Sequence, residues 1–235
     1  MINFNSSSIS SGFASQRIVW LGAIVWIFAV QFFVVQVVVQ SAWETPFSLM
    51  HNFISDLGNT RCGPYPIDSE MYVCSPWYRW MNASFILLGM IILVGALLVH
   101  KAFTGGIART AGLTFLVLAG FGNIAVGLFP EDVNNTYHTI GAAAHFIFGN
   151  IGMSALGIAF GQNRQRPGVL IYSIVSGMVG LLATGLFVSG HYLGMGIGGM
   201  ERIAAYPLPL WLIVMGIFFV TNVPAEPNQS YMDSP

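Results

Sequence analysis

Six apolar segments, each about 20 residues long, constrain this chain more than any other feature of its sequence. They cover residues 18–39, 77–99, 110–129, 137–161, 168–190 and 203–221. A helix rises ~1.5 Å per residue, so a helix of this length crosses the ~30 Å hydrocarbon core of a bilayer. Only helices and closed barrels satisfy their backbone hydrogen bonds in lipid, and unbroken apolar runs favour helices. We therefore predict an all-α bundle of six transmembrane helices.

Composition also indicates a multi-pass membrane protein. Charged residues make up 7% of the chain, against ~25% in soluble domains, and the mean hydropathy is +0.70. The formal net charge of -1 provides no basic surface for nucleic acid, so we expect membrane lipids as partners and leave protein partners open. No linker divides the chain. We predict one membrane domain over residues 1–235, with polar tails at 1–16 and 223–235 and an external loop at 40–76.

The distribution of lysine and arginine sets the predicted orientation. If the N-terminus is cytoplasmic, the basic residues inside are Arg17, Lys101, Arg109, Arg164 and Arg166, and those outside are Arg61, Arg79 and Arg202. An excess of basic residues marks the cytoplasmic side. We therefore expect a multi-pass protein of the cell membrane with both termini in the cytoplasm.

The chain has two cysteines, Cys62 and Cys74, and both lie in the 40–76 loop. The predicted orientation places this loop in an oxidising compartment, where disulfides form. We predict a Cys62–Cys74 disulfide, which would contribute about 3 kcal/mol by closing a short loop. Two free thiols are the alternative.

Ionisable residues gather at the predicted outer face. The stretch Phe129–His145 passes Glu131 and Asp132 and then enters the fourth apolar segment, which contains His138 and His145. His145 follows His138 by two helical turns, so it lies ~10 Å deeper, inside the hydrocarbon zone. Ionisable groups there usually face the bundle interior or a wet cavity. Asp56, Arg79, His191, Glu201 and Arg202 also fall at this face. We expect an outward-facing polar cavity lined by Asp56, Glu131, Asp132, His138, His145, His191, Glu201 and Arg202.

One hypothesis for this cavity is metal-dependent hydrolysis of a lipid-like substrate. The candidate ligands of a divalent ion such as zinc are His138, His145, His191 and Asp56. The candidate general bases are Glu131 and Asp132, and the candidate substrate contacts are Glu201, Arg202 and Arg79. The sequence contains no His-x-x-x-His pair, so the ligands would come from different helices.

Two further hypotheses use the same residues differently. The polar side chains could be structural, for example with Glu201 and Arg202 in ion pairs that fix helix ends. The chain would then be a non-catalytic lipid-binding or scaffolding protein. A proton relay could run from Glu131 or Asp132 through His138 to His145, but the inner half of the segments offers no continuation.

The glycine-rich run at residues 191–200 precedes the sixth apolar segment. No strand precedes this run, so it is not a dinucleotide-binding fingerprint. We predict that it forms a mobile or re-entrant external loop.

Several short motifs follow one another along the chain. They are Ile54–Gly63 (ISDLGNTRCG), Cys74–Trp77 (CSPW), Met81–Phe85 (MNASF), Leu128–Val133 (LFPEDV), His138–Ala142 (HTIGA), Phe148–Asn150 (FGN) and Gly198–Pro207 (GGMERIAAYP). This pattern resembles the DUF998 family of bacterial and archaeal membrane proteins over about residues 18–222. The resemblance implies a six-helix membrane protein and transfers no catalytic role.

A more distant resemblance is to the alkaline ceramidase and adipoQ-receptor superfamily of seven-helix membrane hydrolases. Those proteins place a serine, an aspartate and three histidines around zinc. The same residue types occur here as Ser55, Asp56, His138, His145 and His191. The chain departs from that pattern in having six apolar segments and no His-x-x-x-His.

Overall fold

The structure is a computed structural model that describes residues 6–65, 71–103, 105–163 and 166–222. Residues 1–5 of the predicted 1–16 tail, the predicted 223–235 tail, part of the 40–76 loop and Arg164 lie outside these residues. Six segments are long and apolar enough to cross a membrane: Ser15–Gln40, Tyr78–Ala102, Ile107–Leu128, Asn135–Gly161, Pro167–Val188 and Gly196–Asn222. The predicted six-helix bundle is confirmed.

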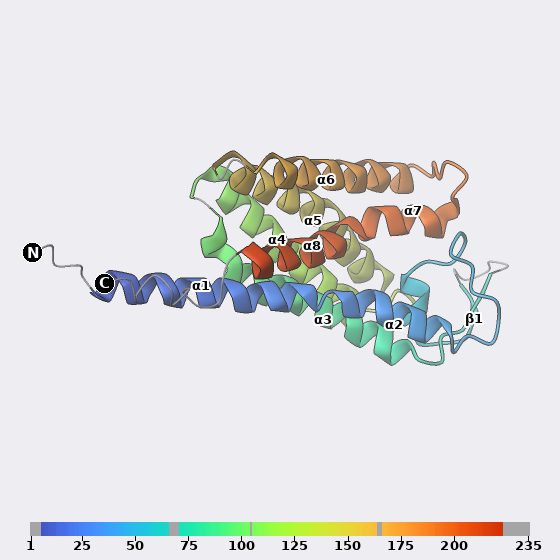
Figure 1. Ribbon diagram of the computed structural model, residues 1–235. Coiled ribbons are helices and arrows are strands. Elements are labelled where there is room, and N and C mark those ends of the chain that lie inside the picture. Colours follow the sequence, from blue (N-terminus) through green and yellow to red (C-terminus); the bar gives the residue numbers. More distant parts are fainter. Residues whose placement is uncertain (1–5, 66–70, 104, 164–165, 223–235) are drawn as a thin grey trace, which may run out of the picture.

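Four long helices in the middle of the chain follow one another antiparallel through short connections (Figure 1). They are α3 (Tyr78–Val99), α4 (Ile107–Leu128), α5 (Asn135–Asn163) and α6 (Pro167–Val188), with a short 3-10 turn η2 (His100–Ala102) after α3. Gly122 of α4 faces Gly141 of α5 so closely that a Cβ on either would meet the carbonyl of the other. Small residues of this kind let membrane helices approach closely.

The first membrane segment consists of two helices, α1 (Ser6–Ile27) and α2 (Val30–Gln40). Between them the backbone tightens, and the Ala29 N–H donates to the Trp26 carbonyl three residues earlier at 3.0 Å. Such a short 3-10 stretch interrupts the α-helix without any proline.

The last segment also consists of two helices, α7 (Gly196–Ala205) and α8 (Pro207–Asn222). Proline has no N–H to donate and fits the first turn of a helix, so Pro207 begins α8. The prediction of a loop at 191–200 is therefore wrong from Gly196 onwards, where α7 has already begun. α8 packs against α1, α5 and α6 and runs back to the end at which α1 begins (Figure 1). We call that end of the bundle the terminal end.

Aromatic side chains fill the bundle interior near the terminal end. The Trp26 ring lies 5.5 Å from the Trp211 ring and 6.2 Å from the Phe219 ring, centroid to centroid. Phe103 and Phe160 complete this aromatic cluster. All five side chains are buried, and tilted aromatic pairs at such distances attract one another beyond the burial of their area.

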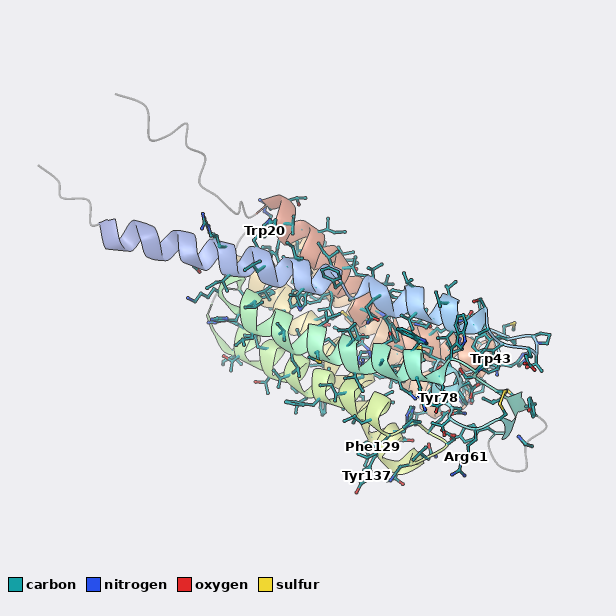
Figure 2. All side chains as sticks on the ribbon, turned by 90° about the horizontal axis from the view of Figure 1, so that it is seen from below. Trp20, Trp43, Arg61, Tyr78, Phe129 and Tyr137 are labelled. Atoms are coloured by element: carbon teal, nitrogen blue, oxygen red, sulfur yellow. A yellow bond between two sulfur atoms is a disulfide. The ribbon has the colours of Figure 1, made fainter. Side chains whose placement is uncertain are left out.

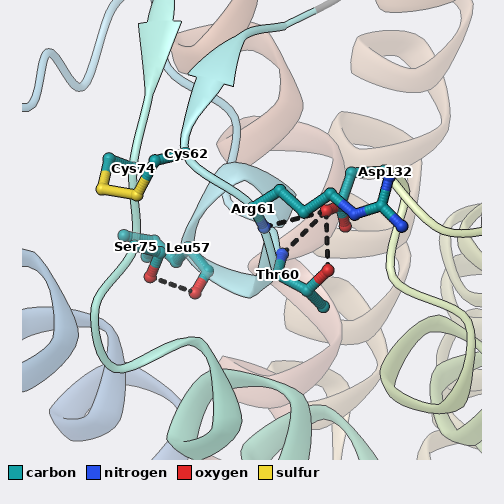
Figure 3. The surroundings of a disulfide bond; sticks show 7 residues. All are labelled: Leu57, Thr60, Arg61, Cys62, Cys74, Ser75 and Asp132. Carbon is teal, nitrogen blue, oxygen red and sulfur yellow. Dashed lines mark hydrogen bonds between the residues drawn. A yellow bond between two sulfur atoms is a disulfide. The ribbon is translucent and has the colours of Figure 1, made fainter.

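The opposite end, here called the loop end, holds the connection over residues 41–77. It contains the 3-10 turn η1 (Ser55–Gly58) and a two-residue antiparallel pair, β1 (Gly63–Pro64) with β2 (Tyr72–Val73), in which Gly63 lies opposite Val73. The predicted Cys62–Cys74 disulfide is confirmed and lies beside this pair (Figure 3). The Ser75 hydroxyl donates to the Leu57 carbonyl at 2.7 Å and holds the two halves of the loop together.

Aromatic side chains also mark the outside of the bundle. Figure 2 shows Trp43, Tyr78, Phe129 and Tyr137 near the loop end, and Trp20 towards the terminal end. Tryptophan and tyrosine are enriched where a membrane meets water. Their positions agree with a bundle that crosses the membrane between its two ends.

Candidate functional site

A small cavity lies inside the bundle near the loop end. Its volume is about 30 Å³, which is room for one or two water molecules. The polar residues that line it are Ser55, Asn123, His138, His145 and Glu201. Its apolar walls include Phe32 of α2, Phe85 of α3 and Val126 of α4. We call it the inner cavity.

A wider groove adjoins the inner cavity. Its volume is about 240 Å³. The residues that line both hollows are Ser55, His138, Ala142, Phe146 and Glu201. The outer groove adds Glu131, Tyr65, Phe53 and Phe187, so it lies between the loop, α5, α6 and α7. We call the inner cavity, together with the part of the outer groove beside Ser55, His138 and Glu201, the polar chamber. The aromatic side chains of the outer groove form the approach to it.

Two carboxyl groups, Glu131 and Glu201, line this chamber, a third, Asp56, is in contact with Glu131, and each of the three is buried. Asp56 is 0% exposed, Glu201 7% and Glu131 8%. The Ile54 N–H donates to Glu201 Oε2 at 2.5 Å, and the Ser55 hydroxyl donates to Glu131 Oε2 at 2.8 Å. These bonds attach the turn η1 to α7 and to the α4–α5 connection. The carboxyl groups therefore position Ser55 at the junction of the two hollows.

Asp56 and Glu131 lie within hydrogen-bonding reach of each other. Asp56 Oδ2 accepts from the Phe53 N–H at 2.9 Å and the Asn52 amide at 3.0 Å. Asp56 Oδ1 and Glu131 Oε1 have no other partner among the described residues. A single proton between the two carboxyl groups satisfies both oxygens.

Burial raises the pKa of both carboxyl groups of this pair. The pKa of Glu131 is raised well above its usual value, first by desolvation and then by the charge of Asp56. The pKa of Asp56 is also raised by desolvation, but hydrogen bonds from Asn52 and the Phe53 backbone oppose that rise. The proton of the pair therefore favours Glu131, which donates a hydrogen bond to the Asp56 carboxylate.

Arg202, a predicted substrate contact, holds the loop against α7. Its Nη1 donates to the carbonyls of Asn52 and Gly198, each at 2.8 Å, and to that of Leu49 at 3.2 Å. Its guanidinium lies 5.6 Å from the centre of the Phe47 ring. These contacts fix the backbone over residues 47–52.

Asp132, a predicted general base, also holds the loop. Its Oδ2 accepts from the Thr60 N–H and the Thr60 hydroxyl at 2.9 Å each, and from the Arg61 N–H at 3.1 Å (Figure 3). It lines neither the inner cavity nor the outer groove. Asp132 therefore anchors the loop from a position outside the two hollows.

The structure separates the predicted metal ligands. His138 and His145 both line the inner cavity, whereas Asp56 contacts Glu131 and lines neither hollow. His191 is exposed, with its Nδ1 at 3.1 Å from the Ser189 hydroxyl, and it lines neither hollow. Among the described residues, no group of three or more His, Cys, Asp or Glu side chains is placed to hold a metal ion. The metal site stays a prediction.

Arg79, a predicted substrate contact, is exposed and lies outside both hollows. Its Nε donates to the hydroxyl of its neighbour Tyr78 at 3.3 Å. Sequence reasoning also missed the aromatic walls of the groove, Phe53, Phe146 and Phe187. Phenylalanine is frequent throughout these helices, so composition gives no signal that separates these three from lipid-facing ones.

Comparison with known proteins gives one match. The model of a family described as "Protein of unknown function (DUF998)" matches residues 27–217. No curated protein and no solved structure matches the chain. The matched range includes the loop, the buried carboxyl groups and all the polar residues of the inner cavity. The chain therefore belongs to the DUF998 family.

Proposed function

We propose that this protein binds a lipid-like molecule at one face of the membrane. The head group of the ligand occupies the polar chamber, and its apolar chain leaves along the outer groove between α5 and α6. The observation that supports this most directly is that the two hollows adjoin and share Ser55, His138 and Glu201 in their linings. A polar chamber with an apolar approach matches the two parts of an amphipathic molecule.

The aromatic walls supply the surface for the apolar part. Phe187 lies 6.1 Å from Phe53 and 6.5 Å from Phe146, measured between ring centres. Phe146 and Phe187 belong to membrane-crossing segments, so a chain that follows them stays at the depth of the bilayer. Burying such a chain against aromatic rings is favourable by roughly 25 cal/mol per Å².

The orientation belongs to the same proposal. The loop end faces outside the cell and both termini lie in the cytoplasm, as the lysine and arginine distribution predicts. The disulfide supports this placement, because disulfides persist in oxidising compartments. The ligand therefore enters from the outer leaflet of the cell membrane.

Photolabelling tests the proposal. Tetradecanol with a diazirine in its chain is incorporated into phosphatidylcholine nanodiscs that contain the protein, and the labelled peptides are identified by mass spectrometry. We expect labelling of α5 between Thr139 and Phe146, and of α6 near Phe187. Ala142→Trp fills the point where the hollows meet and should abolish this labelling.

The matched control is Ile140→Trp, which places the same side chain on α5 at a position that lines neither hollow. This variant should label as the wild type does. Uniform labelling of all helix surfaces, unchanged in Ala142→Trp, would contradict the proposal.

Metal-dependent hydrolysis of the bound ligand stays a prediction for the same chamber, because His138 and His145 both line it. Metal analysis of detergent-purified protein, prepared without chelator, tests it directly. Near-stoichiometric metal that both His138→Ala and His145→Ala lose would support hydrolysis. Protein without metal would leave ligand binding alone.

A further inference from the structure

We infer that the ligand's head group is a protonated primary amine; this inference depends on the proposed binding function and specifies its ligand. Three features of the chamber lead to it: an acidic lining without a lysine or arginine, hydrogen-bond acceptors without donors of their own, and aromatic walls.

The first feature is charge. Two carboxyl groups, those of Glu131 and Glu201, line the hollows, and Asp56 is hydrogen-bonded to Glu131. Arg202 donates to backbone carbonyls and, like every other lysine and arginine of the described residues, lines neither hollow. An ammonium group in the chamber therefore faces acidic side chains and no competing cation.

The second feature is the set of hydrogen bonds that the lining residues already make. The Ser55 hydroxyl donates to Glu131, and His138 Nδ1 lies 3.0 Å from the Phe129 carbonyl, to which it donates. One ring nitrogen of His145 is hydrogen-bonded to the backbone of Ala205. The donors of these side chains are therefore used within the protein.

Acceptors are left over. His145 is 3% exposed and lines the inner cavity, and its Nδ1 has no hydrogen-bond partner among the described residues. Its other nitrogen is the donor to Ala205, so Nδ1 offers a lone pair. The Ser55 oxygen, whose own proton is donated to Glu131, adds a further acceptor. A primary ammonium donates three hydrogen bonds and accepts none, which fits this set, whereas a phosphate or carboxylate accepts only.

The third feature is the wall of the outer groove. Phe53, Phe146 and Phe187 present aromatic rings beside the acidic residues Glu131 and Glu201. A cation is attracted to the face of an aromatic ring, and this attraction is strongest where water is excluded. A neutral head group would gain neither this attraction nor the charge compensation.

Competition against the diazirine-tetradecanol label in phosphatidylcholine nanodiscs tests the inference on the full-length protein. The competitors share one chain and differ in the head: tetradecylamine, tetradecanol, tetradecyl phosphate and tetradecyltrimethylammonium. We expect the amine to compete at a concentration about tenfold lower than any of the other three, because a charge-assisted hydrogen bond corresponds to such a factor.

Glu201→Gln removes the charge but keeps an oxygen that accepts from the Ile54 N–H. It should reduce the advantage of the amine to within about threefold of the alcohol. Glu44→Gln changes the charge equally at an exposed position of the same end and should leave the advantage intact. If Glu201→Gln fails to fold, the four competitors on the wild type still decide.

The outcomes separate the inference from the proposed function. The amine inference would be overturned if all four compounds competed equally. It would also be overturned if tetradecyltrimethylammonium competed as well as tetradecylamine. In both cases the ligand site itself would stand. Absence of specific labelling, with wild type and Ala142→Trp alike, would remove the proposed function itself.

Discussion

At the scale of single residues, the pair formed by Asp56 and Glu131 dominates the site. Two carboxylates at this burial repel each other and are poorly solvated, so the ionised pair is unfavourable. Holding one proton between them removes the repulsion and satisfies two otherwise unpaired oxygens. The pair joins the turn η1 to the connection between α4 and α5, so its protonation state is linked to the docking of the loop.

This pair makes stability dependent on pH. The Glu131 carboxyl holds its proton in the folded protein at pH values where an unfolded one, with a pKa near 4.5, has lost it. The folded state then binds more protons, so stability is fully present below pH ~4.5 and falls as the pH rises through the raised pKa of Glu131. The carboxyl groups of Asp56 and Glu201 interact with Glu131 and raise its pKa further. Thermal unfolding in detergent between pH 5 and 9 measures this loss.

Glu131→Gln should weaken that dependence and raise the melting temperature at neutral pH. Glutamine donates to Asp56 through its amide and accepts from Ser55 through its oxygen without carrying a charge. Glu44→Gln, at an exposed position, is the control and should change neither quantity. A wild-type protein that gains stability from pH 5 to 8, relative to Glu131→Gln, would refute the shared proton.

At the scale of elements, α7 is shaped by its contact with the loop. Gly196 has a φ of 71°, in the left-handed region that favours glycine. Gly198 lets the loop approach its backbone, and its N–H donates to the Met50 carbonyl at 2.9 Å. The same contact places Glu201 and Arg202, which follow in α7, at the loop. The glycines therefore serve to position the site.

Gly198→Ala should destabilise the protein by about 1–3 kcal/mol, the usual effect of an added methyl group in a packed interior. A Cβ at this position would meet the carbonyl groups of Asn52 and Leu49, which are backbone atoms and cannot rotate away. Gly105→Ala is the matched control, because a Cβ there meets nothing within 4 Å. Equal melting temperatures of the two variants would show that the loop does not pack on α7 in this way.

The disulfide acts on the other half of the loop. Cys62 and Cys74 are separated by 12 residues, and closing a loop of this length contributes roughly 3 kcal/mol. The double variant Cys62→Ser with Cys74→Ser should lower the melting temperature in detergent and expose the loop to protease. Wild-type protein treated with dithiothreitol should behave like the double variant. Unchanged unfolding and proteolysis would mean that the hydrogen bonds alone hold the loop.

At the scale of the whole molecule, the two ends of the bundle differ in chemistry. The loop end contains buried carboxyl groups, histidines and the two hollows, whereas the terminal end is filled by the aromatic cluster. Six membrane segments return the last helix to the side of the first (Figure 1). The orientation of the bundle therefore decides which compartment reaches the site.

Single cysteines test the orientation. In the Cys62→Ser, Cys74→Ser background, Glu44→Cys places an exposed thiol at the loop end and Gly105→Cys places one at the opposite end. A membrane-impermeant thiol reagent should label position 44 in intact cells and position 105 only after the membrane is broken. The reverse pattern would show that the bundle is inverted in the membrane.

The sequence predicted the bundle and half of the site, for identifiable reasons. Long apolar segments leave few alternatives in lipid, and His138 and His145, two turns apart, were bound to share one face of α5. Glu131 and Glu201 lie close to these histidines because both are near the loop end. Arg79 and His191 lie at the same end but point outwards. The sequence therefore predicts at which end of the bundle a residue lies. It does not predict whether the side chain points into the bundle or away from it.

The remaining differences arise from packing. Both faces of a membrane helix are apolar, so the phenylalanines of the groove look like those that contact lipid. Glycine has a low intrinsic helix propensity, so the run at 191–200 favours a loop. Contact with residues 49–52 overrides that propensity from Gly196 onwards. A single sequence contains no information on that contact.

The aromatic cluster at the terminal end has a physiological consequence. Trp26, Trp211 and Phe219 are fully buried and fill the bundle beyond the inner cavity. Close-packed rings leave no room there for a column of water along the bundle axis. Expression of the protein should therefore leave the electrical potential across the membrane unchanged, which a voltage-sensitive dye would measure.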